Sequence, residues 1–165
     1  MKHILLSILF FLNTIALFAQ DNIFMTVIVP ERENIPSEAA KQLQVKLQQL
    51  VAANGIASDD ANNRFVITAK ASILTKDIIP GPPISVSQNI DFTIIIGDAV
   101  ENKIFETYTI STTGVGQNEN KSFTSAIKNI KSKNKELIAF LEKGKQDIVS
   151  YYNSRCTQVK QEAQS

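Results

Sequence analysis

The sequence predicts an α+β fold: a two-layer sandwich in which a four-stranded mixed sheet carries helices on one face, with a long C-terminal helix. Between residues 65 and 113, three segments with the alternating apolar pattern of half-buried strands follow one another, as in an antiparallel meander. One amphipathic helix separates them from an earlier apolar run, so that run is expected to join the same sheet through a helical crossover. The element order is therefore β-α-β-β-β-α-α.

The first strand and the first helix have clear boundaries. Residues 23–29 form a near-continuous apolar run closed by Pro30, which predicts a buried strand. Pro36 suits the first turn of a helix. Gly55 is expected in the left-handed conformation that ends this helix, with Ile56 folding back on it. Apolar residues recur at three- and four-residue spacing between these limits: Ala40, Leu43, Leu47, Leu50 and Val51.

Three further strands are predicted over residues 65–74, 86–96 and 104–113. Pro80-Gly81-Pro82-Pro83 forms a stiff loop between the first two of them, and Asn102 lies near the tip of the hairpin between the last two. The segment Gly114-Val115-Gly116 is expected to break the last strand. It precedes a helix, as phosphate-binding loops do, but it completes neither the dinucleotide nor the Walker pattern, so a simple strand-to-helix turn is expected.

The remainder of the chain reads as two helices. Phe123, Ala126, Ile127 and Ile130 mark a short helix that completes an α+β domain over residues 20–133. Residues 134–165 form the long C-terminal helix, whose apolar side is interrupted by Gly144, where a bend is expected. No helix-stop residue lies near Ser165, which fits either a frayed end or a chain that continues as helix; we take the second as a hypothesis.

Residues 1–19 have the layout of a secretory signal peptide. Lys2 and His3 form a short basic start, residues 4–18 are almost wholly apolar, and Ala19 is a small residue at the exit. The apolar stretch is shorter than the roughly 20 residues of a spanning helix. We expect Sec-dependent export, cleavage after Ala19, and a periplasmic or outer-membrane-associated protein with no membrane span. An uncleaved N-terminal anchor is the alternative. The exit site has no cysteine nearby, so a lipid anchor is not indicated.

Composition narrows the chemistry further. The 165 residues include 17 basic and 16 acidic side chains, one histidine and one cysteine. The histidine is His3, so removal of the signal leaves a domain without histidine and with zero net charge. No Ser-His-Asp triad, imidazole metal site or histidine general base is then available, and no overall positive field attracts nucleic acid. We expect no catalytic residue, no metal and no cofactor, and a protein partner of the cell envelope; the oligomeric state is left open.

Four residues are candidates for an interaction surface. Tyr151 and Tyr152 are neighbours on the last helix and cannot both face inward, so one of them is expected to be exposed and available to a partner. Cys156 lies on the same helix and is expected to be an inert thiol or to pair with another chain. Pro82 is the candidate from the proline-rich loop.

An enzyme or a small-ligand carrier is the alternative class. A hydrolase or binding protein of this kind would use carboxylates in a cleft between sheet and helices. The available acids are scattered along the chain: Asp59, Asp60, Asp77, Asp91, Asp98 and Glu101. Asp59 and Asp60 lack the spacing of a calcium loop, and turn chemistry explains them better.

One short motif gives a family resemblance. A strand through Thr112-Thr113-Gly114-Val115-Gly116 leads into Ser122-Phe123-Thr124-Ser125-Ala126, after a β-α-β-β-β order and a signal peptide. This resembles small bacterial envelope domains: the N-terminal domain of TolB, domains of the LPP20 and FlgT type and, more distantly, CsgG. The likeness covers roughly residues 23–130. It implies a non-catalytic binding or scaffold role and carries no catalytic residue across.

Overall fold

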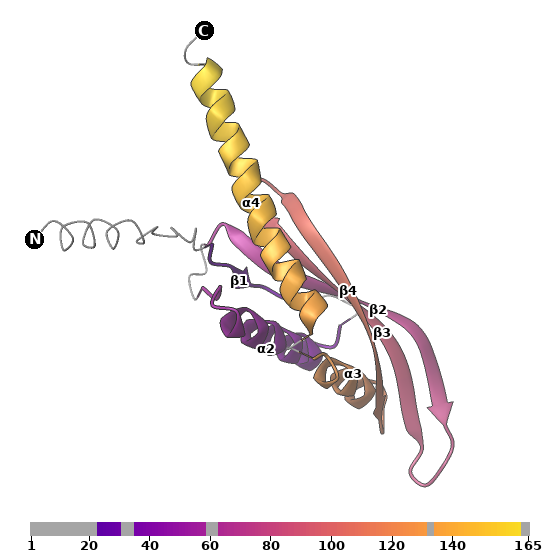
Figure 1. Ribbon diagram of the computed structural model, residues 1–165. Coiled ribbons are helices and arrows are strands. Elements are labelled where there is room, and N and C mark those ends of the chain that lie inside the picture. The colour runs from indigo at the N-terminus through magenta and orange to yellow at the C-terminus, as the bar shows by residue number, and fades with distance from the viewer. Residues whose placement is uncertain (1–22, 31–34, 59–62, 132–133, 163–165) are drawn as a thin grey trace, which may run out of the picture.

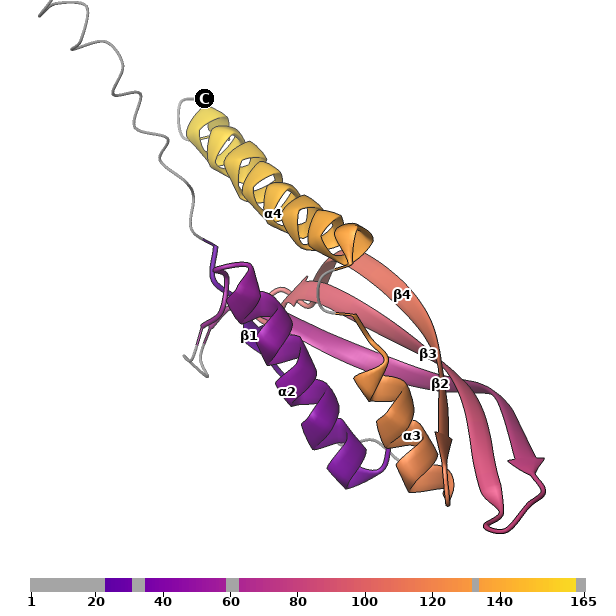
Figure 2. The ribbon, with the colours of Figure 1, turned by 60° about the horizontal axis from the view of Figure 1, so that its bottom comes forward.

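The computed structural model describes residues 23–30, 35–58, 63–131 and 134–162. The elements follow the predicted order: β1 (Thr26–Val27), α2 (Ser37–Ala53), β2 (Phe65–Ile79), β3 (Ser85–Asp98), β4 (Lys103–Gly116), α3 (Glu119–Lys128) and α4 (Lys135–Glu162). The sheet order is β1-β2-β3-β4, with β1 parallel to β2 and the other pairs antiparallel. Figures 1 and 2 show the helices on one face of this sheet. The predicted α+β two-layer class is confirmed.

The first strand is much shorter than the sequence predicted. Only Thr26 and Val27 pair with β2, and the preceding residue, Met25, instead donates its N–H to Ile56 O at 2.8 Å. The apolar run alternates in burial: Met25, Val27 and Val29 are buried, whereas Phe24 and Ile28 are about half exposed. The segment is therefore buried on one side only, although its sequence is a continuous apolar run.

The meander is longer than the sequence predicted. Strand β2 extends to Ile79 and pairs with β3 from Phe65↔Asp98 to Ile79↔Ser85. Strand β4 continues to Gly116, so the expected break at Gly114 is wrong. The distal half of β2 lies beyond the helices and buries few side chains, which is why core-based alternation did not reveal it. Asn102, with φ 51°, turns the β3–β4 connection as expected.

The core fills the space between the sheet and the three helices. Inward residues of the central strand β3 alternate at every second position and contact aromatic and aliphatic side chains of the helices. Phe92 meets Phe123 of α3 edge to face, with ring centroids 5.7 Å apart. Helix α2 contributes the predicted apolar stripe, and it ends as predicted at Gly55, whose φ is 67°, with Ile56 buried and bonded back to Val51 O.

Gly114 and Gly116 allow α3 to lie directly on β4. A Cβ added at Gly114 would lie 1.9 Å from Ser122 O and 2.5 Å from Ala126 N, and one at Gly116 would lie 2.4 Å from Ser122 N. Polar bonds fasten the same contact: Ser122 Oγ donates to Gly114 O at 2.9 Å, and Thr112 Oγ1 donates to Ala126 O at 3.0 Å. The glycine segment therefore marks a place where a helix packs against bare strand backbone.

Helix α4 runs without interruption past Gly144, where a bend was expected. Its first half is buried through Leu137, Phe140, Leu141 and Ile148, and its C-terminal turns extend past the end of the sheet (Figure 1). A Cβ at Gly144 would lie 2.4 Å from Ile96 Cδ1, so this glycine lets the helix approach β3. Among the described residues, no helix is long and apolar enough to span a membrane.

Replacing Gly114 by alanine should destabilise the protein. The new Cβ collides with the backbone of α3, which cannot rotate away, so we expect the free energy of unfolding to fall by roughly 1–3 kcal/mol or more in urea denaturation. Val115→Ala is the matched control, because Val115 lies between the two glycines on β4 and its side chain is 50% exposed. Equal stability of Gly114→Ala and wild type would contradict the close approach.

Candidate functional site

Helix α4 is held against the β3–β4 hairpin by a polar cluster, the Arg64 cluster. It brings together residues from the start of β2, the β3–β4 turn and the middle of α4: Arg64, Asp98, Glu101, Tyr151, Tyr152 and Arg155. Two of the predicted interaction residues, Tyr151 and Tyr152, thus lie in a contact within the chain. Asp98 and Glu101, two of the scattered acids, converge in the same place.

Arg64 is the centre of this cluster. Its Nε lies 2.6 Å from Asp98 Oδ2, and its Nη2 lies 2.7 Å from Glu101 Oε1 and donates to Tyr152 OH at 2.6 Å. The Tyr152 hydroxyl in turn donates to Asp98. Asp98 is fully buried, and its other oxygen accepts from the backbone N–H groups of Val100 and Glu101. Every strong acceptor site on this buried carboxylate is therefore used.

The second carboxylate is equally occupied. Glu101 accepts from the Tyr151 hydroxyl at 2.9 Å and pairs with Arg155 Nη1 at 2.5 Å. The two tyrosine rings contact each other edge to face, with centroids 5.0 Å apart, and Arg64 lies over the Tyr152 ring. Basic residues of α4 thus pair with acidic residues of the sheet and its β3–β4 turn.

These contacts fix the protonation states. Burial raises the pKa of Asp98, but hydrogen bonds from Tyr152, Arg64 and two backbone N–H groups outweigh it and lower the pKa to about 2. Burial and the bond to Asp98 raise the pKa of Tyr152 to about 12. At neutral pH the carboxylate stays ionised and the phenol stays protonated, so neither is tuned to exchange protons. The converging acids therefore form a structural ion-pair cluster, and they give no support to a hydrolase.

The sequence predicts that one tyrosine of the pair is exposed. In the structure neither tyrosine ring is free. Both are half buried, and both hydroxyls are hydrogen bonded. Cys156 lies one turn further along α4, is exposed and carries a free thiol. Whether it pairs with another chain stays a prediction. The predicted signal residues 1–19 and the acidic pair Asp59-Asp60 lie outside the described residues.

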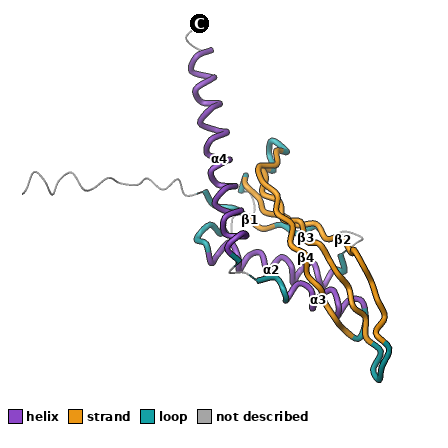
Figure 3. The backbone as a smooth tube through the Cα atoms, turned by 45° about the vertical axis from the view of Figure 1, so that its right-hand side comes forward, coloured by secondary structure: helices purple, strands orange, loops and turns teal. Residues whose placement is uncertain are grey.

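The β2–β3 hairpin ends in an exposed apolar tip, residues 78–84, which includes the predicted Pro82. Figure 3 shows this tip beyond the ends of α2 and α3. Ile78 is 71% exposed and Ile84 is 62% exposed, with Ile79 and the three prolines exposed beside them. Large aliphatic side chains that gather on a projecting loop are typical of a surface that docks on a partner.

A pocket of about 460 Å³ lies between the sheet and the N-terminal ends of α2 and α3. Gln88 lines it and is only 1% exposed, yet its Oε1 has no hydrogen-bond partner among the described residues. Gln88 is not among the residues that the sequence predicts for a site. It could be recognised from the sequence, because Gln88 lies two residues before Ile90 and four before Phe92, on the same inward face of β3. Positions on such a face usually carry an apolar side chain.

Comparison with known proteins gives only distant likenesses. No family model and no curated protein matches the chain. A minor lipoprotein from Acinetobacter baumannii is 16% identical over 85% of this chain and 95% of its own, with a TM-score of 0.40. The PelC dodecamer from Paraburkholderia phytofirmans is 17% identical over 67% and 86%, with a TM-score of 0.41. A protein described as a lipoprotein from Caulobacter crescentus is 9% identical over 78% and 90%, with a TM-score of 0.36. At these identities and TM-scores, neither a family nor an activity is transferred from them.

Asp98 should make the stability of the protein depend on pH. Its pKa in the folded state, about 2, lies below its ordinary value of 3.8, so its stabilising contribution is full above about pH 4 and is lost as the pH falls towards 2. We expect Asp98→Asn to be less stable than wild type at pH 7 and to show a smaller loss between pH 4 and pH 2 in urea titrations. Asp77→Asn, at an exposed position of β2, is the control and should keep the wild-type profile. If Asp98→Asn kept the wild-type dependence of stability on pH, the stabilising role of Asp98 in the Arg64 cluster would be contradicted.

Proposed function

We propose that this chain is a non-enzymatic interaction module of the bacterial cell envelope, exported by the Sec pathway, which docks on a partner protein through the tip of its β2–β3 hairpin. The observation that carries the proposal is the tip itself. Ile78, Ile79 and Ile84 expose large aliphatic surface at the end of a long hairpin that the rest of the fold does not need. An exposed apolar loop favours aggregation unless a partner covers it.

The tip is rigid enough to be a docking element. Strand β2 pairs with β3 up to Ile79↔Ser85, so the ladder continues to the loop. On its other side β3 pairs with β4 as far as Val86↔Gly116. Three strands therefore support the exposed residues almost to their end, and little conformational entropy is lost when a partner binds.

The predicted surface on α4 supports the proposal less directly. Tyr151 and Tyr152 are committed to the Arg64 cluster, so they are not free to anchor a partner while α4 is docked. Cys156 remains exposed next to them, and intermolecular pairing through it is compatible with an exported protein. We therefore place the principal contact at the hairpin tip and keep α4 as a secondary one.

Site-specific photo-crosslinking in intact envelopes tests the proposal. A benzophenone amino acid at position 84 should give a defined protein adduct, and the same probe at position 100 should give none. Val100 is the matched control because it is 70% exposed and also lies in a hairpin turn, at the opposite end of β3. Adducts of equal yield from both positions, or adducts with lipid alone, would contradict a partner protein at the tip.

The tip residues should matter for binding and not for folding. Ile78→Ser and Ile84→Ser alter exposed side chains, so we expect the free energy of unfolding to change by no more than about 0.5 kcal/mol. Ile78→Ser should nevertheless abolish the adduct formed at position 84. Persistence of that adduct in the stable variant would overturn the assignment of the tip.

A further inference from the structure

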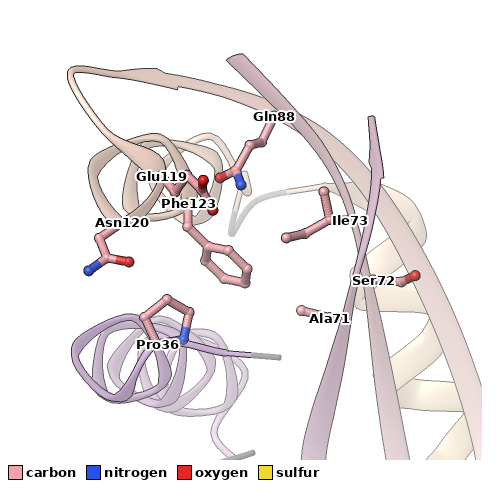
Figure 4. Close-up of a pocket in the computed structure, with 8 residues that line it drawn as sticks. All are labelled: Pro36, Ala71, Ser72, Ile73, Gln88, Glu119, Asn120 and Phe123. Carbon is pink, nitrogen blue, oxygen red and sulfur yellow. The ribbon is translucent and has the colours of Figure 1, made fainter. Parts of the chain in front are cut away.

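Gln88 is buried in a way that the fold alone does not explain. It lies on the inward face of β3, it is 1% exposed, and its Oε1 finds no donor among the described residues. An unpaired buried carbonyl is costly, and it is rare in native proteins. Figure 4 shows the Gln88 amide directed into the pocket between the sheet and the two helix N-termini. A donor that comes from outside the chain would satisfy it.

The walls of the pocket indicate what that donor must be attached to. Apolar surface comes from Pro36, Ala71, Ile73 and Phe123, which surround the space opposite Gln88 (Figure 4). Ser72 and Asn120 add polar groups to the lining. The charged residue on the wall, Glu119, accepts from Lys76 Nζ at 2.9 Å. A carboxylate cannot donate to Oε1, and the neighbouring Lys76 disfavours a second cation. The occupant therefore has an apolar body and one neutral N–H or O–H donor at its end.

The pocket opens beside an edge of β2 along which the described residues place no strand beyond Ile67. Strand β1 pairs with β2 only at Val66 and Ile67, and within the described ranges no other strand lies along that side of β2. Ile28 N–H donates to Ile67 O at 2.9 Å, which shows that the backbone groups of Ile67 point to this edge. Backbone groups alternate in direction along an antiparallel strand, so those of Ala71 and Ile73 point to the same edge, up to the β-bulge that lies between Ile73 and Thr75. The side chains of both residues line the pocket.

We propose that an extended peptide segment of a partner protein pairs with the edge of β2 at Ala71–Ile73 and inserts a tyrosine or tryptophan side chain into the pocket, where its O–H or N–H donates to Gln88 Oε1. An added strand runs about 4.8 Å beyond β2, so only a long side chain reaches an amide that lies on β3. Tyrosine and tryptophan combine that reach with an apolar ring and a neutral donor. Strand addition of this kind takes affinity from backbone bonds and specificity from a side-chain pocket.

The site goes beyond the docking function of the hairpin tip and does not depend on it. The tip comprises residues 78–84, whereas the pocket uses Gln88 and the residues that precede the tip on β2. Failure of either one therefore leaves the other standing.

Binding of designed peptides to the full chain tests the proposal. The probes are capped heptapeptide libraries, random except for a central Trp, Tyr, Phe or Ala, measured by fluorescence polarisation after selection. We expect the Trp and Tyr libraries to yield binders, and a Tyr-to-Phe change in a selected peptide to weaken binding about 3- to 10-fold. With Gln88→Met that change should have no effect, whereas Gln49→Met, at an exposed position of α2, should behave as wild type. Equal binding of Tyr and Phe peptides to wild type would overturn the proposal.

Two further measurements separate this site from a structural role of Gln88. N-methylation at every second backbone position of a selected peptide, in one of the two registers, should abolish binding, because it removes the N–H groups that pair with the β2 edge. Gln88→Met should raise the Tm of the free protein by about 2–8 °C, because it removes an unsatisfied buried acceptor. A lower Tm in Gln88→Met, or binding that tolerates N-methylation in both registers, would overturn strand addition at this pocket.

Discussion

The arrangement of the helix layer depends on the close approach of α3 to β4. Because Gly114 and Gly116 have no side chain, the helix rests on strand backbone and is bonded there through Ser122 and Thr112. This contact places Phe123 against Phe92 in the core. It also sets the N-terminal end of α3 opposite the N-terminal end of α2, and the space left between them is the Gln88 pocket. A bulkier residue at position 114 would move a wall of that pocket as well as a helix.

Strand β3 carries two buried polar side chains whose hydrogen-bonding surroundings differ. Asp98, at one end of the strand, is surrounded by Arg64, Tyr152 and two backbone N–H groups, so its charge is fully compensated. Gln88, ten positions earlier on the same strand, has an oxygen without a partner among the described residues. Asp98 and its partners stabilise the packing of α4 on the sheet. Leaving a buried acceptor unpaired, as at Gln88, costs about 1–3 kcal/mol of stability.

Much of the fold was predictable because the core imposes periodicity. The stripe of α2, the glycine at its end and the order of the meander all followed from apolar spacing. The distal half of β2 did not, because exposed strand residues have no reason to alternate. The sequence predicts a strand break at Gly114, because the sequence cannot distinguish a glycine in a turn from a glycine against which a helix packs. The Arg64 cluster joins residues 88 positions apart, a contact for which the local sequence holds no signal. Gln88 is detectable from the sequence, because it is a polar residue on the core face of a predicted strand.

The way in which α4 is attached has a consequence for how the molecule opens. The turns of α4 beyond Ile148 are joined to the sheet by side-chain contacts, namely the Arg64 cluster and the packing of Tyr151 on Phe105 and of Tyr152 on Phe65. The strands of the meander are joined by continuous backbone ladders. The last turns of α4 can therefore separate while the sheet stays intact, as a cooperative unit with its own small opening free energy. We therefore expect the amide hydrogens of these turns to exchange with solvent before those of β3.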